Sequence, residues 1–274
     1  MTQSADPSSP APDLTPVRWT VVIPYFNERD YLPDTLATLD QQTVKPFRLV
    51  LVDNASTDGG PAVVRQAAEA MAGVSVEHRL EPRPGKIHAL ETGLQAVETA
   101  YVAVCDADTI YPPEYLARAE ALLDAGAVAA LAFGVDAPIE TARAQRFLRR
   151  RAWAAQLLPW QCHTGGFGQA FRTDALVAAG GLSAERWPYV LEDHEVIARI
   201  VQHGPLGYDR EHWCRTSDRR KDRGDVNWTT AEQLLYHFTP KVAQPGYFRR
   251  FLGPRLAARG MSNVNLRRRD WDAD

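Results

Sequence analysis

Short apolar runs alternate with stretches of helical spacing in the first part of the chain. Four runs rich in β-branched and other apolar residues predict strands. They are residues 19–24, 47–52, 74–78 and 101–105. Apolar residues at helical spacing predict helices at residues 31–42, 61–72 and 88–98. Because strands and helices alternate, we expect an α/β fold: a mostly parallel, doubly wound sheet with helices on both faces.

Acidic and amide residues stand directly after three of these predicted strands. Asn27 and Glu28 come after the first strand. Asp53 follows the second, and Asp106 and Asp108 follow the fourth. Ligands of open α/β sheets bind outside the carboxyl ends of the strands. The pattern therefore predicts one ligand site at one edge of the sheet.

The Asp106-Ala107-Asp108 tripeptide is the most specific of these groups. Alternate residues of extended chain point the same way, so both carboxylates can face one ligand. Carboxylate oxygens suit Mg²⁺ or Mn²⁺, which also bind phosphates. The alternative is a strand-end turn with two solvated aspartates, because such tripeptides are common.

The second half of the chain has a different pattern. Residues 140–158 predict a basic amphipathic helix, and residues 163–182 predict a Gly-rich loop that leads into a helix. Residues 204–214 predict a further strand, and the tail from residue 215 is rich in arginine. We expect one domain over residues 17–214, with this tail packed on it.

The boundary inside the expected domain falls near residue 110. Residues 17–110 would bind one ligand and residues 111–214 another, and residues 215–274 would form an Arg-rich loop and a helical tail. Residues 1–16 are rich in Pro, Ser and Asp and lack the apolar core of a signal peptide, which predicts a disordered leader.

Composition narrows the class of protein further. The 274 residues carry 31 Lys and Arg against 34 Asp and Glu, a formal net charge of -3 that does not suggest nucleic-acid binding. Cys105, Cys162 and Cys214 lack CxxC spacing, which predicts reduced thiols in a cytosolic protein rather than a zinc site. No apolar run approaches 18 residues, so we expect no transmembrane helix.

Six ordered segments make the chain resemble the family 2 glycosyltransferases of the GT-A fold. They are VVIPYFNERDYLPDTLATL, LVLVDNASTDGG, RPGKIHALETGL, AVCDADTIYPPEYL, GGFGQAFRTDALVAAGGL and LEDHEVIARIVQHG. Together they cover roughly residues 18–206. Each segment alone is weak evidence, whereas six in the family's order are strong evidence.

The resemblance implies that residues 17–110 bind a nucleotide sugar and residues 111–214 an acceptor, and it also implies a set of donor-binding residues. The base and ribose would be held by Pro24, Tyr25 and Glu28. Asp53 matches the aspartate that hydrogen-bonds the base, although VDDGSTD is the commoner form and this chain has Asn54 and Ala55 there. The alternative for Asp53 is a turn or helix-capping aspartate.

The resemblance also implies the residues that hold the diphosphate. Lys86, after Gly85 at a predicted helix start, would contact phosphate, unless it is only a surface lysine. Asp106 would belong to the donor site and, together with Asp108, would hold a divalent metal, Mn²⁺ or Mg²⁺.

On the acceptor side the resemblance implies that Asp193 is the general base. Glu192 is its neighbour, and Gly165 and Gly166 would line the acceptor loop, where the alternative is a simple glycine turn. Arg172 is a further candidate for holding that loop or meeting the acceptor.

Three features stay open from sequence alone. Ser217, Arg219 and Arg220 resemble a loop that closes over the donor diphosphate, or they belong to a solvated charge run. His212 is the nearby candidate for a third metal ligand. The basic, Trp-containing segment 149–160 either shapes an acceptor pocket, lies on an anionic membrane surface, or is a packed helix with snorkelling arginines.

The expected function is therefore metal-dependent, inverting transfer of a sugar from a nucleotide diphosphate sugar, UDP-linked as the first candidate, to an acceptor hydroxyl. The acceptor would be a saccharide, a lipid-linked or a small molecule, and the protein would work in the cytoplasm or, through peripheral contact, at the inner membrane face. A nucleotidyltransferase acting on a sugar phosphate and a non-catalytic nucleotide-sugar-binding protein are the alternatives.

Overall fold

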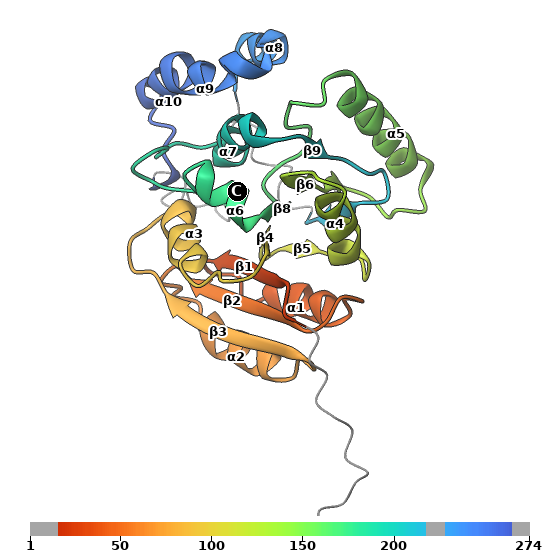
Figure 1. Cartoon of the computed structure of the whole chain (residues 1–274). Helices are drawn as coiled ribbons and strands as arrows, with labels where there is room; N and C mark the ends of the chain where they lie inside the picture. Colours follow the sequence, from red (N-terminus) through yellow and green to blue (C-terminus); the bar gives the residue numbers. More distant parts are fainter. Residues whose placement is uncertain (1–15, 218–227, 265–274) are drawn as a thin grey trace, which may run out of the picture.

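The core of the protein is a seven-stranded sheet in the computed structural model, which describes residues 16–217 and 228–264. In spatial order its strands are β3 (Val74–Leu80), β2 (Phe47–Asp53), β1 (Trp19–Tyr25), β4 (Tyr101–Cys105), β8 (Gly168–Arg172), β6 (Ala129–Leu131) and β9 (Leu206–Gly207) (Figure 1). A small second sheet has the order β5 (Thr109–Ile110), β10 (Trp213–Thr216) and β7 (Phe133–Val135). The four strands predicted in the first part of the chain are present and parallel, which confirms the α/β, mostly parallel fold.

Strand β8 is the main departure from the predicted pattern. It runs antiparallel between β4 and β6, where the sequence predicted a loop before a helix. Ala170 and Phe171 turn toward opposite faces of the sheet and are fully buried, so this short segment gains its stability from tertiary packing. The strand predicted at residues 204–214 is likewise two short strands, β9 and β10, which belong to different sheets.

Helices cover both faces of the sheet, as predicted. One face packs against α1 (Leu32–Asp40), α2 (Gly60–Glu69) and α4 (Tyr115–Asp124). The other packs against α3 (Lys86–Leu94), α6 (Thr173–Ala178) and α7 (Glu192–Ile200). Within β1, Val21 and Ile23 enter the first core and Val22 enters the second, because side chains alternate across a strand.

The other helices among the described residues lie in the second half of the chain. They are α5 (Ala142–Leu157), the short η1 (Val201–His203), α8 (Thr230–Phe238), η3 (Lys241–Ala243), α9 (Gln244–Gly246), the π-helical η4 (Tyr247–Leu252) and α10 (Gly253–Ala258). Residues of α8, η4 and α10 form a third core with Ala198 of α7 and Ile87 of α3. Glu232 in α8 is buried and pairs with Arg255 and Arg259, which fixes α8 against α10. The C-terminal segment thus rests on the two helices that begin at the candidate site.

Candidate active site

The carboxyl ends of β1, β2 and β4 meet at one edge of the sheet. Tyr25 pairs with Asp53 in the parallel register, and β4 ends one residue before Asp106. Asp53 Oδ1 accepts a 2.9 Å hydrogen bond from the Ser56 amide, which uses one of its two carboxylate oxygens. The structure thus brings Tyr25, Asp53 and Asp106 to the same edge, as the strand pattern predicted.

Two aspartates follow β4, and each is about 8% exposed. Asp106 accepts a 2.6 Å hydrogen bond from Lys86 Nζ, and Asp108 accepts one of 2.8 Å from the Ser217 hydroxyl. The two carboxylates are therefore tied to different elements, α3 on one side and the end of β10 on the other.

The backbone at Asp106 is fixed by a tyrosine that the sequence interpretation missed. The Asp106 amide donates a 2.8 Å hydrogen bond to the Tyr111 hydroxyl, which donates in turn to the Phe167 carbonyl at 2.5 Å. Burial raises the pKa of Tyr111 well above its ordinary value, so the hydroxyl keeps its proton. These two hydrogen bonds, here called the Tyr111 brace, join the turn at Asp106 to the loop before β8. The only sequence signal for this role of Tyr111 was its closeness to Asp106.

Lys86 lies between the two halves of the site. It is the first residue of α3, where the helix end carries partial positive charge. Its Nζ atom lies 2.6 Å from Asp106 Oδ1 and 3.8 Å from Glu192 Oε1. A single ammonium therefore contacts a carboxylate of the predicted donor side and one of the predicted acceptor side.

The loop that carries Lys86 is held by Asn54, one of the two departures from the commoner VDDGSTD form. Asn54 is buried, and its amide group donates to the carbonyls of Glu81 and Arg83 at 2.9 and 2.7 Å. Its Oδ1 accepts from the Gly85 amide at 2.9 Å. Three bonds from one side chain therefore fix residues 81–85, and an aspartate could not donate two of them.

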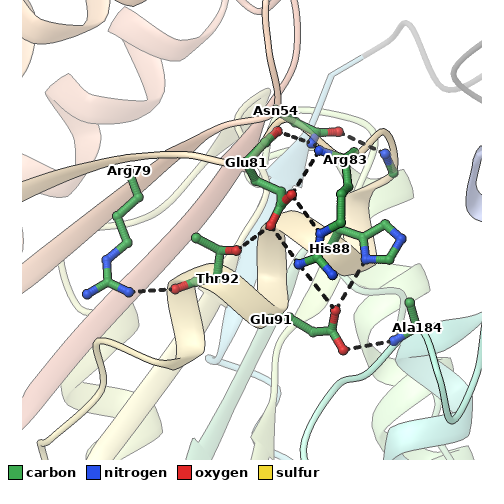
Figure 2. Close-up of polar contacts among 9 residues, drawn as sticks. Asn54, Arg79, Glu81, Arg83, His88, Glu91, Thr92 and Ala184 are labelled. Carbon is green, nitrogen blue, oxygen red and sulfur yellow. Dashed lines mark hydrogen bonds and ion pairs between the residues drawn. The ribbon is translucent and has the colours of Figure 1, made fainter.

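Glu81 supports the same loop from the other side (Figure 2). Its carboxylate accepts from the Arg83 guanidinium, the Arg83 amide and the Thr92 hydroxyl. These partners, Arg83 first, lower the pKa of Glu81 to about 2 in spite of its burial. Glu91, which lies 3.3 Å from His88, also accepts from the Ala184 amide, so the network links α3 to the segment before α7.

The predicted acceptor side is built at the start of α7. Leu191 has a left-handed backbone with φ of 65°, and Glu192 and Asp193 are the first two residues of the helix. A non-glycine residue in this region costs of order 1 kcal/mol and is held there by surrounding structure. The strained turn aims two carboxylates at the edge of the sheet.

The two neighbouring carboxyls have opposite pKa shifts. Burial, with the negative charge of Asp193, raises the pKa of Glu192 in spite of nearby Lys86. Burial also acts to raise the pKa of Asp193, but the His194 ring and amide, together with Lys86, outweigh it and lower that pKa. Asp193 Oδ1 accepts from the His194 amide at 2.9 Å and lies 3.1 Å from His194 Nδ1. Asp193 is therefore the ionised member of the pair, as a general base requires.

The Gly-rich loop lies against this carboxylate. A Cβ atom at Gly166 would lie 3.1 Å from Asp193 Cβ, and one at Gly165 would lie 2.5 Å from the Phe167 ring. A larger residue at Gly166 would press against Asp193, and one at Gly165 would collide with the Phe167 ring. Glycine at both positions lets the backbone lie this close to the two side chains.

Two other candidates, Arg172 and His212, lie elsewhere. The expectation that Arg172 lies at the acceptor side is wrong. Arg172 pairs with Tyr101 at the start of β4, which is the end of the sheet away from Asp106, and forms an ion pair with Asp174 there. His212 lies just before the first residue of β10, whereas Ser217, which hydrogen-bonds Asp108, follows the last residue of that strand. The ring of His212 is fully buried and stacks on the Tyr115 ring, with 5.1 Å between the ring centroids.

His212 therefore does not join Asp106 and Asp108 as a third metal ligand, because it is enclosed by the core between α4 and β10. Arg219 and Arg220 lie outside the described residues.

The donor set fits a divalent cation only in part. Asp106 and Asp108 supply the hard carboxylate oxygens that such a cation takes, and diphosphate oxygens would complete its coordination. Among residues 16–217 and 228–264, no group of three or more His, Cys, Asp or Glu side chains is arranged to hold a metal. In the same part of the chain, no helix is long and apolar enough to cross a membrane.

A cavity of about 390 Å³ lies beside Asp108, between the start of α1 and the small sheet. Tyr31 and Asp34 line it on one side and Arg215 and Ser217 on the other. Polar side chains from three elements thus face a space that adjoins the Asp108 carboxylate.

Solved structures with this architecture are glycosyltransferases of the GT-A fold. A mannosyltransferase from Pyrobaculum calidifontis, in complex with GDP-Man and Mn²⁺, aligns over 92% of this chain and 77% of its own, with a TM-score of 0.61 and 25% identity. TarS from S. aureus, in complex with UDP-GlcNAc, aligns over 88% and 73%, with a TM-score of 0.56 and 16% identity. The protein therefore has the GT-A fold.

The family is shown by the sequence itself. Residues 20–176 match the model of glycosyl transferase family 2, and the chain belongs to that family.

Two curated relatives show how far the similarity extends. An undecaprenyl-phosphate 4-deoxy-4-formamido-L-arabinose transferase of Edwardsiella ictaluri is 31% identical over 48% of this chain and 40% of its own. An uncharacterised glycosyltransferase of Mycobacterium tuberculosis is 41% identical over 39% of this chain and 44% of its own. The matched region spans less than half of these relatives.

Proposed function

We propose that the protein transfers a sugar, with inversion, from a nucleoside diphosphate sugar to an acceptor hydroxyl, using a divalent metal. The observation that carries this proposal is the position of Lys86, whose ammonium lies within 4 Å of the carboxylates of Asp106 and Glu192. Glu192 is next to Asp193 in the sequence. A donor diphosphate and an acceptor oxygen placed on either side of this ammonium would be close enough to react.

The donor side would work through charge and fit. Tyr25, Pro24 and Glu28 would border the base and ribose, and Asp53 would hydrogen-bond the base. Asp106 and Asp108 would hold Mn²⁺ or Mg²⁺, which when bound neutralises charge on the leaving diphosphate. Lys86 would add positive charge at the start of α3, where phosphate is favoured.

The acceptor side would supply the base. Asp193, kept ionised by His194, would take the proton of the attacking hydroxyl as it approaches the anomeric carbon from the face opposite the diphosphate. Glu192, whose raised pKa favours its protonated form, would act beside it as a hydrogen-bonding group for the acceptor. Gly165 and Gly166 would leave room for the acceptor next to Asp193.

For the substrates, a UDP sugar is the first candidate donor, and the GDP-Man complex of the similar mannosyltransferase makes a GDP sugar the second. The undecaprenyl-phosphate transferases among the relatives make a lipid-linked acceptor a candidate beside a saccharide or a small molecule. We place the reaction in the cytoplasm, at the inner face of the membrane when the acceptor is lipid-linked.

The test is incubation with a panel of UDP and GDP sugars, with and without Mn²⁺, while thermal unfolding and nucleotide release are followed. A bound donor raises the melting temperature by mass action. Metal-dependent release of nucleoside diphosphate supports the proposal. Release of pyrophosphate from a nucleoside triphosphate and a sugar phosphate would instead indicate a nucleotidyltransferase, and no response to any donor contradicts the proposal.

A further inference from the structure

The outward face of α5 carries an amphipathic stripe of exposed side chains. Arg146, Arg150, Trp153 and Leu157 are spaced by four, three and four residues, so they lie along one side of the helix. Trp153 is 64% exposed and Leu157 is 55% exposed. The opposite side is the buried one and contains Ala144, Leu148 and Ala155. Exposing an indole and a leucine on one stripe is costly in water, which suggests that something covers them.

Charge on α5 is of one sign. The helix contains five arginines and no acidic residue, although the whole chain has a net charge of -3. Within the described residues, Arg143 pairs with Asp136, and no ion pair is found for the other four. Arg151 lies over the Phe147 ring at 5.2 Å, so an exposed aromatic ring and a cation also meet on the flank. As far as the structure describes the chain, four arginines of the helix thus offer uncompensated positive charge beside exposed apolar groups.

A second exposed apolar surface lies at the end of α8 and in η3. Phe238 is 82% exposed and Val242 is 81% exposed. Beside them is an open groove of about 610 Å³, lined by Leu235, Tyr247 and Arg250 among others. Residues 233–264 contain five basic residues and no acidic one. Arg255 and Arg259 pair with Glu232, whereas no ion pair is found among the described residues for Lys241, Arg249 and Arg250. These three basic residues and the exposed apolar groups resemble the combination on α5.

These two surfaces are joined through the segment after α5. Gln161 Nε2 donates to the His237 carbonyl at 2.7 Å, and His237 Nδ1 lies 2.7 Å from Gln161 Oε1. Both α5 and α8 lie at the end of the molecule remote from β3 (Figure 1). The next residue inward, Tyr236, packs edge-on against His194 with ring centroids 5.9 Å apart. The exposed end of α8 is therefore one layer away from the residue that holds Asp193.

We propose that α5 and the α8–η3 end form a docking surface for an anionic lipid bilayer. Apolar side chains on both elements would enter the interfacial region, and the arginines would meet lipid phosphates. Aliphatic groups such as Leu157 and Val242 favour lipid over nucleic acid, since bases stack on aromatic rings and gain little from aliphatic chains. The docking itself goes beyond the transfer reaction. Only its orientation, with the Asp193 side near the membrane, rests on the proposed function.

The test is co-sedimentation of the full chain with vesicles of equal parts phosphatidylcholine and phosphatidylglycerol, and with vesicles of phosphatidylcholine alone. We expect binding to the first that weakens in high salt, and much weaker binding to the second. The double variant Arg146→Gln/Arg150→Gln should lower the partition coefficient roughly twenty-five-fold, because each basic residue near an anionic surface contributes roughly a factor of five. Trp153→Ser and Phe238→Ser should each weaken binding in both low and high salt.

Matched controls come from surfaces remote from α5 and α8. Arg65→Gln removes an exposed arginine of α2, and Val177→Ser removes an exposed valine of α6, and both should bind as the parent does. All the changed side chains are exposed, and unfolding curves would verify that the variants fold. No binding to the anionic vesicles, loss of binding in the control variants to the same degree, or binding to a single-stranded RNA instead of vesicles would each overturn the proposal. Vesicle binding needs no sugar donor, so failure of the proposed transfer reaction would leave this readout intact.

Discussion

The ammonium of Lys86 donates a 2.6 Å hydrogen bond to the carboxylate of Asp106, which joins the first residue of α3 to the first residue after β4. The same Nζ atom lies 3.8 Å from Glu192 at the start of α7. The start of α3, the end of β4 and the start of α7 thus come together around the Lys86 ammonium. Because the loop before Lys86 is fixed by Asn54 and Glu81, the position of this charge is set by the fold.

Replacing Lys86 by methionine should weaken donor binding. The substitution keeps the length of the side chain and removes a charge-assisted contact worth about 1.5–3 kcal/mol, so the KM for the donor should rise about ten- to hundredfold. Steady-state kinetics with the responsive nucleotide sugar measures this. Lys45→Met is the matched control, because Lys45 forms a similar 2.8 Å ion pair with Asp40 away from the site. Equal effects of the two substitutions would remove the assignment of Lys86 to the donor site.

Replacing Asp193 by asparagine should abolish turnover while donor binding persists. The amide cannot accept the proton of the acceptor, and loss of a general base typically lowers kcat by about 10²–10⁴-fold. Thermal shift with the donor and kcat with donor and acceptor give the two readouts. Asp174→Asn, an exposed aspartate paired with Arg172 at the far edge, should change neither. Unchanged turnover in Asp193→Asn would rule Asp193 out as the base.

Replacing His194 by phenylalanine should change the pH profile of the reaction. The His194 ring helps to lower the pKa of Asp193, so its loss raises that pKa toward the ordinary aspartate value. The rate falls as pH drops through the pKa of the base, and the acid limb of kcat/KM should therefore move to higher pH. His203→Phe, at an exposed position in η1, serves as the control. A limb that stays in place, or moves to lower pH, would contradict the assigned pairing.

Replacing Asn54 by aspartate should loosen the loop that carries Lys86. The carboxylate would face the Glu81 and Arg83 carbonyls without protons to donate, at a cost of about 1–3 kcal/mol for the buried groups. We expect a lower melting temperature and a higher donor KM, although VDDGSTD is the commoner form in the family. Gln66→Glu makes the same amide-to-carboxylate change at an exposed position of α2 and should be neutral. A neutral Asn54→Asp would mean that the loop does not depend on these bonds.

The sequence predicted those parts of the fold whose signal is local. The first four strands have apolar runs, and the residues after them reach one sheet edge because parallel strands end together. The signal for β8 was hidden, because Gly168 and Ala170 have weak strand propensity and the segment pairs only with β4 and β6. The Tyr111 brace and the three bonds of Asn54 depend on partners many residues away, which no local pattern specifies.

Replacing His212 by phenylalanine should stabilise the protein, most of all in acid. Its ring is fully buried against Tyr115, and neither nitrogen has a hydrogen-bond partner among the described residues. Burial lowers the pKa of His212 to about 3, whereas an unfolded histidine titrates near about 6.5.

Because the pKa of His212 is lower in the folded protein than in the unfolded chain, the unfolded chain binds a proton at a higher pH than the folded protein does. His212 therefore does not reduce the free energy of unfolding in this way above about pH 6.5, but it reduces it by about 1.4 kcal/mol per pH unit as the pH falls from there toward about 3. Phenylalanine keeps an aromatic ring against Tyr115, removes two unsatisfied polar atoms and abolishes this titration. The free energy of unfolding should therefore rise by about 1–3 kcal/mol at neutral pH and by more at about pH 5, as measured by urea unfolding at both values. The same change at exposed His203 should have little effect. A loss of stability in His212→Phe at both pH values would show that the ring nitrogens are used in the folded protein.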